Sequence, residues 1–500
     1  MTETASLLVR GGQIYEHDGN VHRPRTADIL IEDGTIAAIG DALAPPGPHQ
    51  VIEAAGRLVL PGLINAHYHS HDTLCRGLFE ELPLEMWLLY TLPMGRNRSR
   101  EEVRARTLVG ALESLRAGIT TVQDMLNLTP LNEAYTEIVL SAYREAGIRV
   151  VFAPMVADIP AIAMVRGGDA LPEDVQEMLG TTALPMEEQV AYLEHQFGRK
   201  REASVLHWAV APFAPQRCTP KLLEACAGLA ERHDLPVYTH VYETKGQALI
   251  ARELFAAHEG SLIVYLKNTG LLGPRLNIVH SVWISRRDMD RLAEAESGVV
   301  LNHLSNMKLK SGIAPIRDLI DAGVRLGLGC DNCSGSDVQN VFQAMKMFCL
   351  LAAVSEPEPA SALAHEAIRH ATLGNARTAG MQSRIGALKP GYSADLVLID
   401  LKDPAYLPYN SAARQLVYSE TGRGVETVIV NGRVVIKEHK ATTIDEDGLR
   451  REVADLMRHF IADYDTVVAS RKRALSCLLE AHRKVWQEDI GMTRFISRTR

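Results

Sequence analysis

Residues 58–69 read LVLPGLINAHYH, an apolar run that ends in two histidines separated by a single residue. Side chains alternate between the two faces of a strand, so His67 and His69 are predicted to project from the same side of a strand end. Two imidazoles that converge on one point form half of a site for a transition metal. The pair alone is a weak signal, and its meaning depends on what the rest of the chain supplies.

The bulk composition indicates a large globular protein. Of its 500 residues, 46% are hydrophobic and 23% are charged, and the formal net charge is −8. This length suits one large α/β barrel with a smaller module. The negative charge and the lack of a dense basic run argue against nucleic acid as a partner. No signal-peptide core or run of about 18 apolar residues occurs, and the seven cysteines are scattered, so we expect no membrane association and a cytoplasmic location.

Both ends of the chain read as short strands joined by hairpin turns. Asp33-Gly34 and Asn431-Gly432 each lie between two strand-like runs, and both dipeptides are typical of two-residue hairpin turns. Two β-rich segments at opposite ends of a chain favour one small domain built from both. We therefore predict a composite β-sandwich formed by residues 1–60 and 386–440.

Between these ends, residues 61–385 alternate between strand-like and helical segments. Eight units of this spacing predict a closed (β/α)8 TIM-like barrel, with an open doubly wound α/β sheet as the alternative. In such a barrel the chemistry lies at the C-terminal ends of the strands and in the loops that follow them. The expected strands are residues 60–69, 119–125, 148–155, 205–212, 236–243, 276–282, 298–302 and 324–331.

Two insertions and a C-terminal extension interrupt or follow this alternation. Residues 70–98 follow the first expected strand, and residues 157–200 follow the third. Loops of this length line a pocket or form subunit contacts, and the sequence leaves both possibilities open. Residues 441–500 have a helical pattern, which we assign to packing or subunit contact. We expect a homo-oligomer, either a dimer or a tetramer.

Polar residues with metal-binding and acid–base chemistry stand at the ends of four expected strands. Three histidines and an aspartate complete a nitrogen and oxygen site that suits Zn²⁺ or Fe²⁺. A ligand set of this size leaves an open position for water, which distinguishes a catalytic site from a structural one. The strand-end residues are His67, His69, His240, Glu243, His280 and Asp331.

With these residues in place, the chain resembles the amidohydrolase superfamily and, within it, the cytosine-deaminase-like aminohydrolases. That group includes guanine, S-adenosylhomocysteine and methylthioadenosine deaminases and the triazine hydrolases. The resemblance covers about residues 5–440 in the family's order and implies a β/α barrel with a composite β-sandwich. The matching motifs are PGLINAHYH (61–69), GITTVQDM (118–125), HVYET (240–244), SNMKL (305–309), SGIAP (311–315), GLGCD (327–331) and GALKPG (386–391).

The resemblance also implies a role for each strand-end residue. Glu243 would be the proton shuttle, His280 would orient or polarise the attacking water and the substrate, and Asp331 would accept a proton from that water. Binuclear members of the superfamily carry a modified lysine at the end of the fourth strand, and no lysine occurs there in residues 208–215, so one divalent cation per chain is expected. Zn²⁺ is the first choice and Fe²⁺ the alternative. The implied metal ligands are His67, His69, His240 and Asp331.

The departures from the family pattern concern the substrate. Purine-type deaminases often have a Pro-His-Ala-Pro-Tyr-like segment after the fourth strand, and Phe213 replaces its histidine here. After the seventh strand, Asn302 and a displaced His303 replace a His-Cys-Pro pattern. These changes argue against a plain adenosine or guanine deaminase. The candidate substrate-binding residues are Trp87, Phe213, Gln216, Asn302 and His303.

We therefore predict a metal-dependent hydrolase, and specifically a hydrolytic deaminase of a nitrogen-heterocyclic small molecule. The alternative is cleavage of an amide, urea or carbamate C–N bond, or of a triazine C–Cl bond, by the same site. Glu243 favours an amine leaving group, because an amine needs a proton and a halide does not. A non-catalytic scaffold would predict missing ligands, and none is missing.

Overall fold

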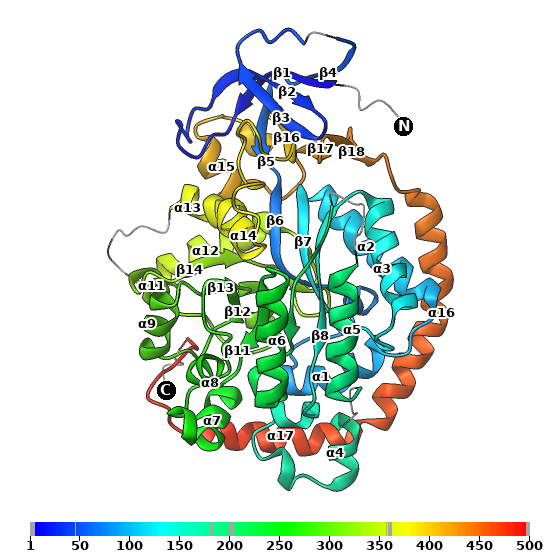
Figure 1. Cartoon of the computed structure of the whole chain (residues 1–500), viewed down its shortest axis with the longest axis vertical. Coiled ribbons are helices and arrows are strands. Elements are labelled where there is room, and N and C mark those ends of the chain that lie inside the picture. Colours follow the sequence, from blue (N-terminus) through cyan, green and yellow to red (C-terminus); the bar gives the residue numbers. More distant parts are fainter. Residues whose placement is uncertain are drawn as a thin grey trace.

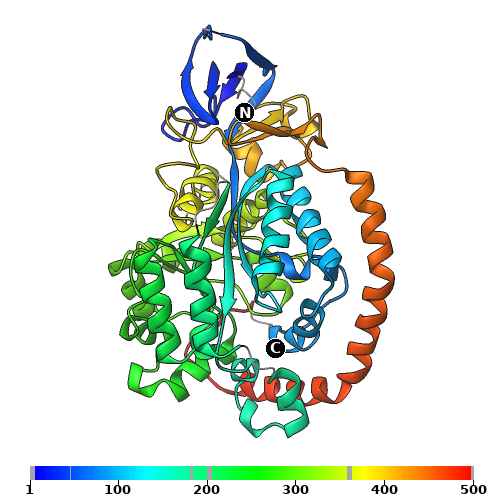
Figure 2. The same cartoon turned by 45° about the vertical axis from the view of Figure 1, so that its right-hand side comes forward.

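The protein is an α/β fold with a small β-sheet at one end of a larger body (Figure 1). The computed structural model describes residues 6–45, 47–180, 184–199, 205–356, 358 and 363–496. Helices α16 (Glu446–Ser470) and α17 (Lys472–Gln487) run down one side of the body and then across the end opposite the small sheet (Figures 1 and 2). The helical character expected from the C-terminal sequence is confirmed.

Strands from both ends of the chain form the small sheet. Its order is β19-β18-β17-β16-β5-β1-β2-β3, with β4 paired to β1. This is one continuous mixed sheet of nine strands, where a sandwich would have two facing sheets. Ile29, Leu396 and Ile429 belong to one buried cluster, so strands from both halves of the sheet enclose a common core. The strands are β1 (Ser6–Ile14), β2 (Arg25–Glu32), β3 (Thr35–Gly40), β4 (His49–Glu53), β5 (Arg57–Pro61), β16 (Leu396–Asp400), β17 (Val425–Val430), β18 (Arg433–Lys437) and β19 (Lys440–Ala441).

The body contains parallel strands in two hydrogen-bonded segments. One has the order β10-β8-β7-β6-β15 with β9 on β8, and the other has the order β11-β12-β13-β14. An isolated parallel bridge between Val210 and Val237 links them on one side. The parallel α/β arrangement is confirmed, and closure into a single barrel stays a prediction. The strands are β6 (Leu63–His69), β7 (Ile119–Leu126), β8 (Arg149–Val156), β9 (Leu206–Trp208), β10 (Ala211–Pro212), β11 (Val237–Val241), β12 (Leu276–His280), β13 (Gly298–Leu301), β14 (Arg325–Leu328) and β15 (Asp331–Asn332).

The first expected strand is in fact two strands that belong to different sheets. β5 ends at Pro61 in the small sheet, and β6 begins at Leu63 in the body. Gly62 joins them where the chain passes close to Thr120, because a Cβ atom at this position would lie 2.1 Å from the Thr120 hydroxyl oxygen. Only glycine fits such a close approach. The apolar run therefore crosses from one sheet to the other at this residue.

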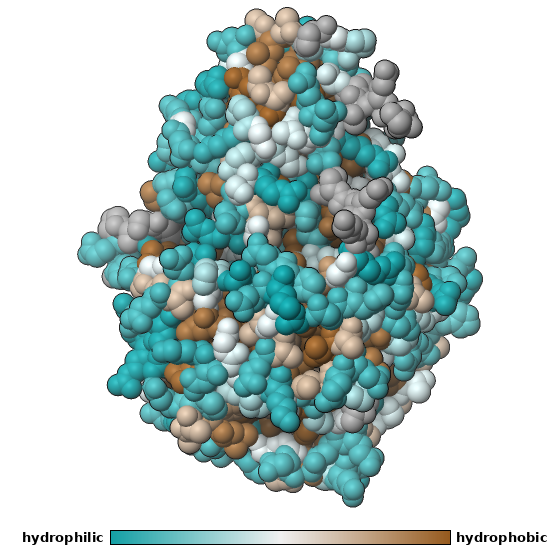
Figure 3. All heavy atoms as spheres, viewed as in Figure 1, coloured by the Kyte–Doolittle hydropathy of each residue, from teal (hydrophilic) through white to brown (hydrophobic). Residues whose placement is uncertain are grey.

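Helices flank the strands of the body, and on the face shown in Figure 3 hydrophilic residues predominate while hydrophobic residues occur in separate small groups. No helix in the described part of the chain is long and apolar enough to cross a membrane. The remaining helices are α1 (Leu84–Gly95), α2 (Arg100–Arg116), α3 (Glu133–Ala146), α4 (Glu173–Leu179), α5 (Met186–Gly198), α6 (Pro220–Arg232), α7 (Lys245–Leu254), α8 (Leu262–Asn268), α9 (Arg286–Glu294), α10 (His303–Lys308), α11 (Ile316–Asp321), α12 (Val341–Val354), α13 (Ala364–Arg369), α14 (Asn375–Thr378) and α15 (Ala412–Tyr418).

A buried ion pair ties the small sheet to the body. Arg149 begins β8, and its guanidinium pairs with Asp395, just before β16, with side-chain exposures of 1% and 3%. Arg149 Nη2 also donates to Ser393 Oγ at 2.8 Å, and Asp395 Oδ1 accepts from the Asn431 amide at 2.8 Å. The pair therefore connects β8 with two segments of the small sheet.

We expect Asp395→Asn to lower the free energy of unfolding by about 3–5 kcal/mol, because the buried guanidinium loses its counter-charge. Urea denaturation measures this loss. The matched control is Asp290→Asn, which breaks an exposed pair with Arg286 and should cost at most about 0.5 kcal/mol. Equal losses in the two variants would contradict the proposed role of the buried pair.

Candidate active site

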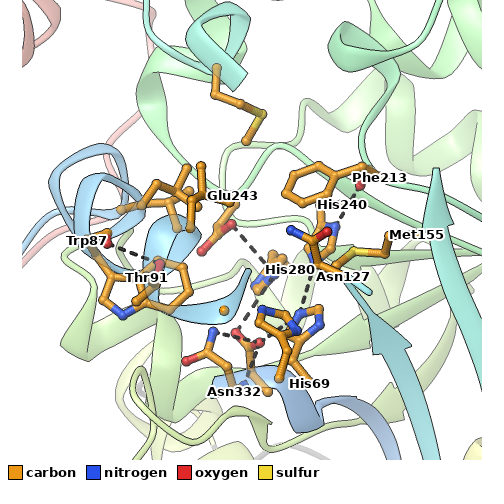
Figure 4. A pocket seen from close by; sticks show the side chains of 17 residues that line it. His69, Trp87, Thr91, Asn127, Met155, Phe213, His240, Glu243, His280 and Asn332 are labelled. Atoms are coloured by element: carbon orange, nitrogen blue, oxygen red, sulfur yellow. Dashed lines mark hydrogen bonds and ion pairs between the residues drawn. The ribbon is translucent and has the colours of Figure 1, made fainter. Parts of the chain in front are cut away.

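The ends of the parallel strands bring all six predicted strand-end residues to one place. Figure 4 labels four of them, His69, His240, Glu243 and His280. β6 supplies two histidines, β11 and β12 supply one each, and the aspartate begins β15. The glutamate lies in the loop between β11 and α7. All six are buried, namely His67, His69, His240, Glu243, His280 and Asp331.

The ligand atoms of this cluster face one another. Asp331 Oδ1 lies 3.3 Å from His67 Nε2 and 3.4 Å from His69 Nε2. His240 Nε2 lies 3.3 Å from His69 Nε2. His280 Nε2 is 4.0 Å from Asp331 Oδ2, so His280 also belongs to the set of potential ligands.

Hydrogen bonds at Nδ1 orient three of the rings. His69 Nδ1 donates to the Met125 carbonyl at 2.5 Å, and His240 Nδ1 donates to the Phe213 carbonyl at 2.6 Å. The Nδ1 of His280 lies 2.8 Å from the side-chain oxygen of Asn306. In each ring, a proton on Nδ1 leaves the lone pair of Nε2 for a metal, a common arrangement at metal sites.

His67 provides the clearest test of whether these residues fit a cation. It is fully buried, and neither ring nitrogen has a hydrogen-bond partner among the described residues. Burial, and next the charge of His69, lowers the pKa of His67 to about 3, so its imidazole is neutral and able to bind a metal. Neutral imidazoles with a carboxylate are the donor set of divalent transition metals. The residues present therefore fit such an ion.

Glu243 is placed to carry a proton. Its Oε2 lies 3.6 Å from His280 Nε2, and its Oε1 accepts a hydrogen bond from Ser311 Oγ at 3.5 Å. Burial, followed by the negative charges of Asp331 and Glu85, raises the pKa of Glu243 well above its ordinary value. A carboxyl group with a raised pKa keeps its proton to higher pH and is suited to act as a general acid.

The backbone is strained at two of these residues. His280 has a φ of 75° and Asp331 has a φ of 65°, and both lie in the left-handed region that favours glycine. Such conformations cost of order 1–3 kcal/mol each and concentrate at functional sites. The strain occurs where the strands end and their side chains turn toward the cluster.

A pocket opens beside the cluster, and two of the five predicted substrate residues line it. Figure 4 shows Trp87 and Phe213 on opposite sides of this pocket. Trp87 is held in place because its Nε1 donates to Ser334 Oγ at 2.8 Å, and Ser334 Oγ in turn donates to Asp72 Oδ2 at 2.5 Å. Phe213 packs at 5.1 Å, centroid to centroid, from the His240 ring. These two aromatic side chains flank the pocket.

The other three predicted substrate residues are not part of the pocket lining. Gln216 lies behind Met164, to whose sulfur its Nε2 donates at 3.1 Å. Asn302 turns back along its own strand and donates to the Val300 carbonyl at 3.4 Å. His303 begins α10, and its ring packs 6.2 Å from that of Phe348 on α12. For Asn302 and His303 this placement follows because α10 starts directly after β13 and directs this segment into the core.

Several lining residues were not singled out from the sequence as site residues. Asn127 comes directly after β7, so the rule about strand ends would have found it. Thr91 comes from the first insertion and Met164 from the second, and neither carries a sequence signal of its own. Both insertions thus contribute to the pocket wall. His71 and Asn332 complete the polar part of the lining.

Comparison with known proteins agrees with this geometry. Residues 58–435 match the Amidohydrolase family. The chain is 31% identical over 445 residues to a 5'-deoxyadenosine deaminase of Methanothermobacter thermautotrophicus, covering 89% of this chain and 96% of the relative. It is 32% identical over 443 residues to a 5-methylthioadenosine/S-adenosylhomocysteine deaminase of Pyrococcus furiosus, covering 88% and 97%.

Solved structures give the same picture at the level of the fold. An adenosine deaminase from Xanthomonas campestris, solved with bound zinc, superposes with a TM-score of 0.78 at 25% identity, covering 92% of this chain and 99% of that one. An atrazine chlorohydrolase from Arthrobacter aurescens, complexed with zinc, has a TM-score of 0.80 at 24% identity, with coverage of 90% and 99%. The second likeness is one of fold.

Proposed function

Because the chain belongs to the amidohydrolase family, as its motifs led us to expect, we propose that it hydrolytically removes the amino group of an adenine-type heterocycle. The protein is an enzyme that acts on carbon–nitrogen bonds. One observation carries the proposal: the buried Glu243 carboxyl, with its raised pKa, lies next to His280 at the edge of the metal-ligand cluster. A departing amine needs a proton, and Glu243 is placed to supply it.

We assign the cation to His67, His69, His240 and Asp331, with one Zn²⁺ per chain. A divalent ion bound there would lower the pKa of a coordinated water and so supply hydroxide near neutral pH. The neutral imidazoles described above support this assignment, as does the bound zinc of the Xanthomonas adenosine deaminase. Lysine is absent from residues 208–215, which supports a single ion.

The chain's own residues divide the proton transfers. Asp331 accepts one proton from the attacking water, and Glu243 protonates a ring nitrogen of the heterocycle. Glu243 then takes up the hydroxyl proton of the adduct and passes it to the departing amine, and the proton held by Asp331 restores Glu243. His280 Nε2 lies between these two carboxylates, and with the ring proton on Nδ1 its lone pair can accept a hydrogen bond from the attacking water and so orient it. Overall, a C–N bond to the amino group breaks, a C–O bond forms, and one water is consumed for each ammonia released.

We also infer that the eight strand positions of the body close into one barrel. The bridge between Val210 and Val237 and the pairing of β15 with β6 support this inference, because they lie where the two segments of the sheet would have to join. Under this proposal residues 61–385 form the barrel domain, and residues 441–500 remain a separate helical extension.

A substrate screen with zinc-loaded protein tests the activity. We expect ammonia from adenosine, 5'-deoxyadenosine or 5'-methylthioadenosine, with the matching inosine-type product detected by ultraviolet absorbance. Chlorotriazines, amides and carbamates serve as the comparison set, with chloride and free amine as readouts. Release of chloride or amine, with no ammonia from any nucleoside, would replace deamination with one of these reactions.

A further inference from the structure

A second hollow adjoins the substrate pocket on the side of Phe213, and we call it the outer chamber. It shares Asn127, Met155 and Phe213 with the pocket. Figure 4 shows these three residues together on one side of the histidine cluster. A heterocycle bound at the cluster therefore has space on this side for a substituent that reaches into the chamber.

The most buried charged group in the outer chamber is Arg217. Its side chain stacks on Phe213, with Cζ 4.6 Å from the ring centroid, and the same phenyl ring lies 5.1 Å, centroid to centroid, from His240. Only 5% of Arg217 is exposed. Its Nε and Nη2 donate to the Ile159 carbonyl, each at 3.2 Å, and no carboxylate forms an ion pair with it within the described ranges.

A second guanidinium adds to the positive charge. Arg96 follows α1 directly, is half-buried and lines the same chamber. Burial and, to a smaller extent, the charge of Arg96 lower the pKa of Arg217 to about 10, so its guanidinium is still cationic at neutral pH. The carboxylate in the chamber lining is Glu188, which is exposed on α5.

Among the residues that the structure describes, Arg217 has no carboxylate as a counter-charge. A buried cation is costly unless an anion pairs with it, and stacking on an aromatic ring offsets only part of that cost. A guanidinium presents two parallel N–H donors that match a carboxylate or a phosphate. The chemistry of the chamber is thus that of an anion-binding site.

We propose that the outer chamber binds an anionic substituent, a carboxylate or a phosphate, of the heterocyclic substrate, with Arg217 and Arg96 as its binding groups. This inference rests on the proposed function, which places the heterocycle at the cluster. It specifies the substrate class as derivatives of the heterocycle that carry an acidic substituent, in contrast to the uncharged nucleosides.

Binding of small anions tests the chamber without reference to turnover. Acetate and inorganic phosphate are titrated calorimetrically into zinc-loaded protein in chloride-free buffer, and the stronger of the two identifies the anion. Arg217→Met should weaken binding at least about tenfold, and Arg217→Lys should retain part of it. Arg96→Met changes a different part of the chain and should also weaken binding, so the test does not depend on the correct folding of a single variant.

Arg287→Gln, which changes an exposed arginine of α9, is the control and should match the wild type. Failure of both anions to bind, or unchanged binding by both methionine variants, would overturn the inference.

Turnover of a matched series separates this inference from the proposed function. Adenosine, adenosine 5'-carboxylate and adenosine 5'-monophosphate differ only in the charged group. We expect kcat/KM to favour an acidic member, and Arg217→Met to raise its KM at least about tenfold with less than about threefold change for adenosine. Equal kcat/KM values and an indifferent variant would refute the inference while the deaminase activity stands. Absence of ammonia from all three would refute adenine-type deamination. In that case the anion titration alone would show whether the outer chamber binds anions.

Discussion

Replacement of Glu243 by glutamine is expected to lower kcat by about 10²–10⁴-fold, the range typical for loss of a general acid–base group. Glutamine preserves the shape of the side chain and its contact with Ser311, but it cannot exchange a proton with the ring nitrogen or the amine. Because Glu243 is not among the proposed metal ligands, the variant should retain its zinc. Steady-state ammonia release and metal analysis by mass spectrometry measure the two quantities.

The control for this variant is Glu294→Gln, which changes an exposed glutamate of α9 and should leave kcat unchanged. Both substitutions replace one carboxyl group with an amide. A Glu243→Gln enzyme that keeps kcat within about threefold of the wild type would remove Glu243 from the mechanism. Loss of zinc in that variant would instead place Glu243 among the ligands.

Removal of the metal is expected to abolish turnover. Dialysis against a chelator should reduce ammonia release to background, because no hydroxide source remains near neutral pH, and added Zn²⁺ should restore it. Reconstitution should saturate at about one ion per chain. Saturation at two ions would contradict the single-metal assignment.

Variants of two buried histidines test whether a proposed ligand is needed for zinc binding. His67→Ala should lose both zinc and activity, because it deletes one ligand. His303→Leu is the matched control: His303 is also buried, and neither of its ring nitrogens has a hydrogen-bond partner among the described residues, but it lies outside the pocket. The control should retain zinc and kcat. Equal metal loss in both variants would show that His67 acts through folding and not as a ligand.

The strand-end positions of the site were predictable from the sequence because parallel strands obey a simple geometric rule. His67, His240 and His280 are far apart in the chain, yet each lies within the last three residues of a strand, and strand ends of this fold meet at one edge. The same rule, applied to β7, also reaches Asn127. The alternation of strands and helices, and the position of a residue at the end of a strand, can be inferred from the local sequence pattern.

The substrate residues were less predictable because their positions depend on packing between distant segments. Trp87 lies in the pocket wall because its indole nitrogen donates to Ser334, which in turn donates to Asp72. The side chain of Gln216 is instead held outside the pocket lining by its contact with Met164, a residue of the second insertion. His303 is adjacent in sequence to Asn302 at a strand end, but the immediate start of α10 buries its ring against Phe348. No periodicity in the chain reports such contacts.

The family, the parallel α/β body and the residues able to bind a cation all follow from the amino-acid sequence, because they depend on strand order and on the chemistry of single side chains. Tertiary structure alone decided that the run at residues 58–69 is divided between two sheets at Gly62, since that depends on the close approach of Thr120. It also decided that Arg217 and Arg96 line one chamber beside Phe213. Contacts between side chains from separate elements arise only when the elements pack, and no local pattern encodes them.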